Sequence, residues 1–140
     1  VSTAPVQVNP DIYCASRTIM FPIENEAMKF IFEHSPLQFR SESTDSVATR
    51  LNLLNIGTAQ VVTIPGEALP NIGYYIKRHM NTKQPFLFGL TNDAFGYILD
   101  KVDFNSFKRY DYICRTSLGE MTGYIYINEV LKWLKTIPSP

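Results

Sequence analysis

Two polar side chains that could form a ligand or catalytic site follow two hydrophobic stretches of the sequence. Glu67 comes after the apolar run VVTI and a Pro-Gly turn, and Tyr97 comes after the apolar run FLFGL and a polar turn. In α/β sheets, the loops at the carboxyl ends of strands are where ligands and catalytic groups collect. If both runs are strands of one sheet, the Glu67 carboxylate and the Tyr97 phenol face the same crevice.

Each of these residues also has an ordinary structural explanation. A single glutamate between a strand and a helix commonly stabilises the helix dipole, and a single loop tyrosine commonly packs on the core. The two histidines are expected at a helix end (His34) and near the inner face of a helix (His79), and neither belongs to a zinc-type spacing. There is no G-x-S-x-G motif and no phosphate-binding glycine loop. The residue pattern alone therefore indicates an α/β domain with one candidate crevice.

The elements that would position these two side chains are a strand, a helix and a second strand. We expect them at residues 60–64, 69–81 and 86–90, with Pro70 tolerated in the first turn of the helix. A strand–helix–strand unit of this length is a βαβ crossover, so its two strands are expected to be parallel. The nearly continuous apolar run FLFGL is typical of a strand buried on both faces.

The rest of the chain predicts further strands and two more helices around this unit. The expected elements are strands at residues 17–21 and 47–56, amphipathic helices at 24–34 and 125–135, and a segment of mixed pattern at 100–123. The tight turn at Gly57 joins the second of these strands to the strand at 60–64 in an antiparallel hairpin. The predicted fold class is α/β, a mixed β-sheet with packed helices and one βαβ crossover.

The chain has the length and composition of one folded domain. Its 140 residues are 45% hydrophobic and 13% aromatic, which is enough for a buried core and lies outside the disordered class. We expect an amino-terminal arm at residues 1–16 and a single α/β domain at residues 17–140. Thirteen basic and thirteen acidic residues cancel, which argues against nucleic acid as a partner. No apolar stretch approaches the roughly 20 residues of a membrane-spanning helix.

The two cysteines, Cys14 and Cys114, lie far apart and have no C-x-x-C partner. A metal or redox motif is therefore not expected. Two arrangements remain open: a disulfide that joins the arm to the late segment, or two buried thiols, of which the thiols are favoured.

Several segments of the chain occur in an order and spacing that match a known pattern. They are RTIMFPIENEAMKF, IPGEALPNIG, GLTNDAFGYI and YICRTSLGEMTG, followed by a terminal helix. Together they resemble the carboxyl-terminal portion of the neutral/alkaline ceramidase-like family, whose members carry a P-G-E turn, a later G-L-x-N-x-x-x-x-Y segment and then a Y-E-x-S-x-S-x-G-like segment. Each motif is short, and the resemblance, over roughly residues 17–135, depends on their order and spacing.

The resemblance implies a zinc-dependent amidohydrolase that splits the N-acyl bond of a sphingolipid amide. In that family the zinc is held by two upstream histidines, the glutamate of P-G-E and the tyrosine of the later loop, and the last two correspond to Glu67 and Tyr97. Zinc polarises an amide carbonyl and activates water. Members are often exported or membrane-peripheral, which is the only indication of location.

The departures from the family pattern limit what this chain is expected to do alone. The upstream histidines and the segment that bears the family's catalytic serine are absent, so no catalytic residue is expected within these 140 residues. Two protein ligands are fewer than a catalytic zinc site normally has, so the chain alone is expected to bind no zinc. In the third motif Ile113 stands where many relatives have glutamate.

We therefore expect the carboxyl-terminal portion of a ceramidase-like enzyme, inactive alone and starting at Val1 without an initiator methionine. An upstream segment of the same protein, or a second chain, would carry the remaining zinc ligands, and a lipid amide would be the substrate. The alternative is a non-catalytic binding or structural domain that retains the family fold. A complete small hydrolase that uses His79 with Glu67 lacks a nucleophile beside that pair.

Overall fold

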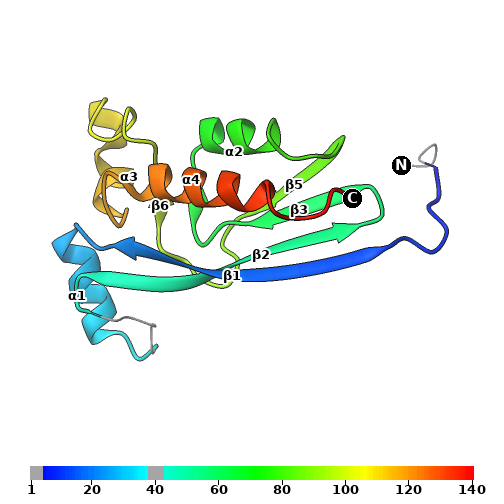
Figure 1. The fold of residues 1–140 in the computed structure, drawn as a ribbon. Helices are drawn as coiled ribbons and strands as arrows, with labels where there is room; N and C mark the ends of the chain where they lie inside the picture. The colour runs from blue at the N-terminus through cyan, green and yellow to red at the C-terminus, as the bar shows by residue number, and fades with distance from the viewer. Residues whose placement is uncertain (1–4, 38–42) are drawn as a thin grey trace.

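The computed structural model describes residues 5–37 and 43–140, which form a mixed α/β fold (Figure 1). The strands are β1 (Ile12–Pro22), β2 (Ser46–Ile56), β3 (Ala59–Thr63), β4 (Glu67–Ala68), β5 (Gln84–Phe88) and β6 (Tyr97–Ile98). The helices are α1 (Glu26–His34), α2 (Pro70–Lys77), α3 (Asp111–Arg115) and α4 (Thr122–Leu134), with a short 3-10 helix η1 (Lys108–Tyr110).

The larger sheet has the strand order β1-β2-β3-β5 and is mixed, as predicted. The β1–β2 and β2–β3 pairs are antiparallel, and the β3–β5 pair is parallel. Since α2 connects β3 to β5, this unit is the predicted βαβ crossover. Several bounds differ: β1 begins at Ile12 rather than at residue 17, α2 ends at Lys77, and β5 covers residues 84–88.

Strict alternation along β2 determines which face of the sheet is buried. Val47, Leu51 and Leu53 are buried on the side that carries α2 and α4, whereas Arg50 and Ile56 are exposed. The two helices supply the opposite wall of the core, with Ile72, Ile76, Val130, Trp133 and Leu134. The buried Tyr126 phenol of α4 donates a hydrogen bond of 3.0 Å to the Thr63 carbonyl at the end of β3. Burial of the apolar residues is the main stabilising term of the fold.

The prediction that the FLFGL strand is buried on both faces is wrong. β5 is an edge strand, and its side chains alternate between half-buried and exposed. Leu87 packs against the core, whereas Phe86 and Phe88 are 46% and 52% exposed. An apolar run predicts two apolar faces, but it does not show whether a second layer is present to cover the outer one.

Two expectations about single residues also need correction. The inner face of α2 is formed by Ile72 and Ile76, with Met80 just beyond the helix, while His79 is exposed and its ring lies 4.6 Å from that of Tyr75. Both cysteines are free thiols; Cys114 is buried but Cys14 is exposed, because it points away from the core on β1.

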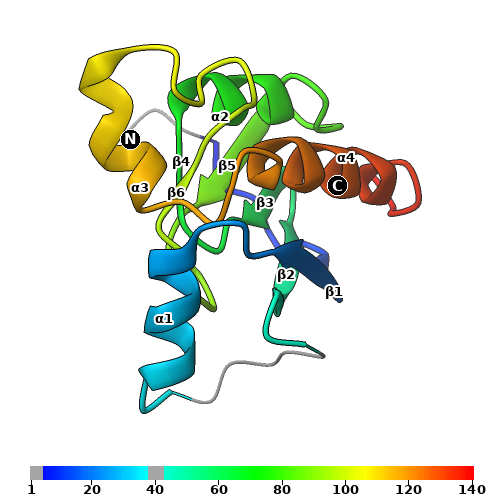
Figure 2. The same ribbon diagram turned by 90° about the vertical axis from the view of Figure 1, so that its left-hand side faces the viewer.

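The segment at residues 100–123 is more regular than its pattern indicated. It contains η1, α3 and the start of α4, and it leads back to the small parallel sheet β4–β6 (Figure 2). Among the described residues, no helix is long and apolar enough to cross a membrane.

Candidate metal site

Glu67 and Tyr97 are directly opposite each other in the two-stranded parallel sheet β4–β6. The Glu67 amide donates a hydrogen bond of 2.9 Å to the Gly96 carbonyl, and the Leu69 amide donates one of 3.0 Å to the Ile98 carbonyl. Residues paired in this way project to the same side of a sheet. The backbone therefore brings together the two side chains that the sequence singled out.

A third segment completes the arrangement around Tyr97. The Tyr97 amide donates a hydrogen bond of 3.0 Å to the carbonyl of Thr116, which lies just after α3. Gly96 has φ +77°, and a Cβ at this position would overlap the Thr116 carbonyl oxygen; a Cβ at Gly66 would overlap the Gly96 oxygen. Each candidate ligand thus follows a glycine that lets two backbones approach closely. We call the backbone contacts among residues 65–67, 95–97 and 116 the junction.

The loop between β5 and β6 is attached to β2 by its asparagine. The Asn92 side chain donates a hydrogen bond of 2.7 Å to the Arg50 carbonyl and accepts one of 3.1 Å from Asn52. Asn92 has φ 72°, a conformation that asparagine tolerates better than most residues. The asparagine of the G-L-x-N motif therefore has a structural function, since it fixes the loop that presents Tyr97.

The start of α1 holds the third motif in place. The Asn25 side-chain amide donates hydrogen bonds of 2.7 Å to the Arg115 carbonyl and 3.0 Å to the Ser117 carbonyl. The Glu24 carboxylate accepts a hydrogen bond of 2.8 Å from the Glu120 amide. All the segments quoted for the resemblance are thus connected to the junction through hydrogen bonds.

The surroundings of the Tyr97 phenol favour its neutral form. The pKa of Tyr97 is raised above 10.0 by the negative charge of Glu67 first, then by burial, by a hydrogen bond to Glu67 and by the nearby Tyr112 phenol. The Tyr112 ring meets that of Tyr97 edge-on, with centroids 6.0 Å apart. A phenolate beside a carboxylate is unfavourable, whereas a cation between the two oxygens would reverse this preference.

We expect Glu67→Gln to lower the pKa of Tyr97 toward 10.0, because the substitution removes the charge that opposes phenolate formation. In the unmodified chain the Tyr97 phenol stays protonated at pH values at which an ordinary tyrosine ionises. The measurement is the alkaline absorbance titration of the chain and of Glu67→Gln, each compared with its Tyr97→Phe derivative. Glu33→Gln, an exposed carboxylate on α1, is the control. An unchanged pKa of Tyr97 in Glu67→Gln would contradict the electrostatic coupling.

The ordinary explanation for Glu67, a carboxylate that caps a helix, does not fit its position. The N-cap of α2 is Leu69, and the first turn of α2 contains no acidic residue. Glu67 is exposed, and the ion pairs formed within the described residues do not include it. The helix-dipole interaction therefore does not account for a carboxylate at this point.

The histidines do not join Glu67 and Tyr97. The Nδ1 atom of His34 lies 2.9 Å from the Phe30 carbonyl, and that of His79 lies 2.8 Å from the Tyr75 carbonyl, so each is engaged with its own segment. Within residues 5–37 and 43–140, no group of three or more histidine, cysteine, aspartate or glutamate side chains could hold a metal ion.

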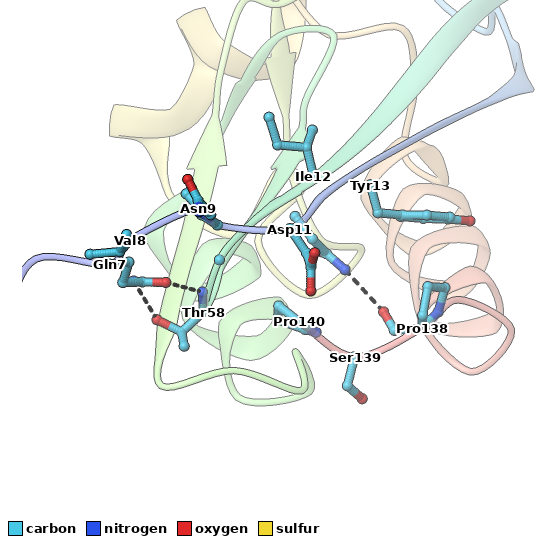
Figure 3. A pocket seen from close by; sticks show the side chains of 13 residues that line it. Gln7, Val8, Asn9, Asp11, Ile12, Tyr13, Thr58, Pro138, Ser139 and Pro140 are labelled. Atoms are coloured by element: carbon cyan, nitrogen blue, oxygen red, sulfur yellow. Dashed lines mark hydrogen bonds between the residues drawn. The ribbon is translucent and has the colours of Figure 1, made fainter.

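A separate pocket of about 500 Å³ lies between the amino-terminal arm and the carboxyl-terminal tail (Figure 3). The Gln7 side chain exchanges two hydrogen bonds of 3.0 Å with Thr58, and the Asn55 side chain donates one of 3.0 Å to the Pro138 carbonyl. Thr58 precedes β3 and Glu67 follows it, so this pocket lies at the other end of the strand. Its contacts attach both ends of the described chain to the β2–β3 hairpin.

Comparison with known proteins finds similarity only at the level of structure. The sequence matches no protein-family model and no curated protein. A solved structure described as a ceramidase complexed with C2 matches 66% of this chain with a TM-score of 0.52 and 16% sequence identity. The chain has a ceramidase-like fold. A neutral ceramidase from Pseudomonas aeruginosa matches 67% of the chain with a TM-score of 0.49 and 13% identity.

The ceramidase-like fold corresponds to only a small part of the proteins that share it. The matched region is 16% of the ceramidase chain, whereas it is two thirds of this one. Sequence reasoning singled out Glu67 and Tyr97, which the structure places opposite each other. It missed the contribution of Asn25, whose partners lie about 90 residues later in the chain. Gly66 and Gly96 precede the two candidate ligands, and these glycines are the feature of the sequence that could have predicted the close backbone contacts.

Proposed function

We propose that this chain is the carboxyl-terminal portion of a zinc-dependent amidohydrolase of the ceramidase type, inactive alone, with Glu67 and Tyr97 as two of its zinc ligands. The observation that carries the proposal is the pairing of these residues in adjacent positions of β4 and β6. Their place in a fold shared with part of a ceramidase supports it. The substrate would be the amide bond of an N-acyl sphingolipid or a related lipid.

The chemistry of the donors fits part of a zinc site. Carboxylate oxygens are common zinc ligands, and a phenolate adds a second anionic oxygen. When bound, zinc would supply polarisation of the amide carbonyl and activation of water. The remaining ligands would come from an upstream segment of the same protein or from a second chain.

The residues of this chain prepare the two donors for that role. The junction fixes the backbone at both positions, and Tyr112 restricts the Tyr97 ring from one side. Because the adjacent Glu67 carboxylate raises the pKa of Tyr97, binding zinc through the phenolate would require release of the phenol proton. Zinc affinity is therefore expected to increase with pH.

Zinc titration of the isolated chain and of the intact protein, meaning the full product of its reading frame, tests this proposal. We expect the intact protein to retain zinc through dialysis, and Tyr97→Phe to lower its zinc affinity at least about 100-fold, because the loss of a direct ligand should exceed the 10- to 100-fold cost of losing a supporting group. The exposed Tyr124→Phe on α4 is the control. The isolated chain should bind zinc more weakly than about 1 μM, because two ligands make an incomplete site.

Tighter zinc binding by the isolated chain would contradict the idea of a shared site. An intact protein that holds no zinc under any of these conditions would favour the non-catalytic binding or structural domain instead.

A further inference from the structure

One edge of the larger sheet is a long strand whose outer side is unpaired within the described residues. This strand, β1, has 11 residues and stands at the end of the strand order β1-β2-β3-β5, beside β2 (Figures 1 and 2). Strands of globular proteins usually have about five or six residues. An edge strand twice as long therefore offers an extended row of backbone groups with which another strand can pair.

The pairing of β1 with β2 shows which backbone groups of β1 point to the outer edge. Just before β1, the Gly57 amide donates a hydrogen bond of 2.9 Å to the Asp11 carbonyl; just after it, the Ile23 amide donates one of 2.8 Å to the Asp45 carbonyl. Both pairs continue the register of β1 and β2. Because alternate residues of an antiparallel strand bond to the same neighbour, the odd-numbered residues of β1 bond to β2. The residues that direct both an N–H and a C=O group to the outer edge are Ile12, Cys14, Ser16, Thr18 and Met20.

The outer edge of β1 lacks the features that usually keep edge strands from pairing, which are short length, lysine, proline within the strand and bulges. β1 pairs with β2 without a bulge, contains no lysine, and has its one proline, Pro22, at the last position. Its one charged side chain, Arg17, is engaged in an ion pair of 3.2 Å with Glu129 of α4. The five outward residues are all exposed, and no hydrogen bond between described residues reaches their edge-facing backbone groups.

The partner that an unpaired edge fits is an extended strand, and β1 is complementary to itself in this respect. Two copies of β1 can pair antiparallel with Ser16 of one copy opposite Ser16 of the other. Ile12 is then opposite Met20 of the second copy, and Cys14 is opposite Thr18, so apolar residues meet apolar ones and small residues meet small ones. In this register all five outward residues of each copy find a partner, which gives ten N–H donors in the pair. Specific protein interfaces typically contain about ten hydrogen bonds.

We propose that the outer edge of β1 is a dimer interface, at which a second copy of this chain pairs antiparallel about Ser16. The two larger sheets then form one continuous sheet, and α4 of both copies covers the same side of it, since antiparallel pairing keeps the faces aligned. Two-fold symmetry of this kind is the commonest in soluble oligomers. A register shifted by two residues toward the end of β1 would place Arg17 opposite Arg17 of the second copy, and like charges in this position are unfavourable. The inference does not rest on the proposed function, because β1 contributes no residue to the junction.

Sedimentation equilibrium of the 140-residue chain at about 100 μM tests the interface, and we expect a dimer at this concentration. Ser16→Pro removes one edge-facing N–H from each copy, so dimerisation should weaken at least about 10-fold. Ser16→Ala keeps this N–H and is the matched control, which should dimerise like the parent chain. The Ser16 amide does not bond to β2, so the Ser16→Pro chain should keep a cooperative thermal unfolding transition close to that of the parent.

A disulfide tests the register, since the Cys14 thiol is free and exposed. Thr18→Cys introduces a thiol opposite Cys14 of the second copy, and the Cα atoms of such a hydrogen-bonded pair lie about 5.5 Å apart, within the range of a disulfide. In a glutathione redox buffer we expect this variant to form a covalent dimer, which is read on a non-reducing gel and located by peptide mass spectrometry. Met20→Cys, also exposed on β1, is the control; it lies opposite Ile12 and should not crosslink to Cys14.

Three results would overturn the proposal. A chain that is monomeric at about 100 μM, or a Ser16→Pro variant that dimerises as tightly as the parent, would show that the outer edge of β1 is not the interface. Crosslinking of Met20→Cys as readily as Thr18→Cys would contradict the pairing about Ser16. A dimeric 140-residue chain beside a monomeric intact protein would assign the edge to a strand from the rest of that protein instead of a second copy.

Discussion

Gly96→Ala is expected to destabilise the chain by about 3–5 kcal/mol, near the upper end of single-substitution effects. The backbone at Gly96 has φ +77°, where an L side chain is strained. The added Cβ would also overlap the Thr116 carbonyl oxygen, which accepts the hydrogen bond from Tyr97. To relieve the overlap, the backbone at Gly96 must move away from the backbone at Thr116. The substitution is therefore expected to break the junction as well as to destabilise the fold.

The measurement is equilibrium unfolding in urea, with Gly73→Ala as the matched control. Gly73 lies within α2, and its Cβ would meet a Leu87 methyl carbon at 3.6 Å, an ordinary contact. Alanine is the better helix former by about 1 kcal/mol, so this control should be neutral or stabilising. If the free energy of unfolding of Gly96→Ala lies within about 1 kcal/mol of the parent value, the junction accommodates the added Cβ more easily than its geometry indicates.

If the proposed function is correct, Glu67→Gln is expected to reduce amide hydrolysis by the intact protein at least about 100-fold, because the loss of the proposed direct ligand should exceed the 10- to 100-fold cost of losing a supporting group. The amide oxygen of glutamine is neutral and binds zinc more weakly than a carboxylate. The fold should persist, since the Glu67 side chain is exposed and its backbone amide keeps its bond to Gly96.

The assay is cleavage of a fluorescent N-acyl sphingosine by the intact protein, with zinc content measured on the same samples. Glu33→Gln, another exposed carboxylate, should leave both quantities unchanged. If Glu67→Gln keeps the parent activity and zinc content, then Glu67 is not a ligand and the assignment of the site fails.

Local patterns were sufficient to predict the central unit of the fold. The run VVTI, the turn at Pro65-Gly66 and the helix beginning at Pro70 each follow rules that act over a few residues, so β3, α2 and β5 were predicted with errors only at their ends. The same rules placed the two candidate ligands after successive strands.

Features that depend on distant contacts were not predictable in this way. β4 and β6 have two residues each, too few for any period to be visible. The exposure of Phe86 depends on the absence of a covering layer among the described residues, which no property of β5 itself reveals. The contacts of Asn25 connect residues about 90 positions apart, and a single sequence contains no signal of that pairing.

The hydrogen bond between Glu24 and Glu120 closes a loop of 96 residues around the junction, and this has a consequence for folding order. Closing such a loop is entropically costly, so we expect contacts of this kind to form late, after the local β2–β3 hairpin. Because Thr116 is among the last residues of the junction to be synthesised, we expect the backbone at Gly96 and Tyr97 to reach its final arrangement late in folding.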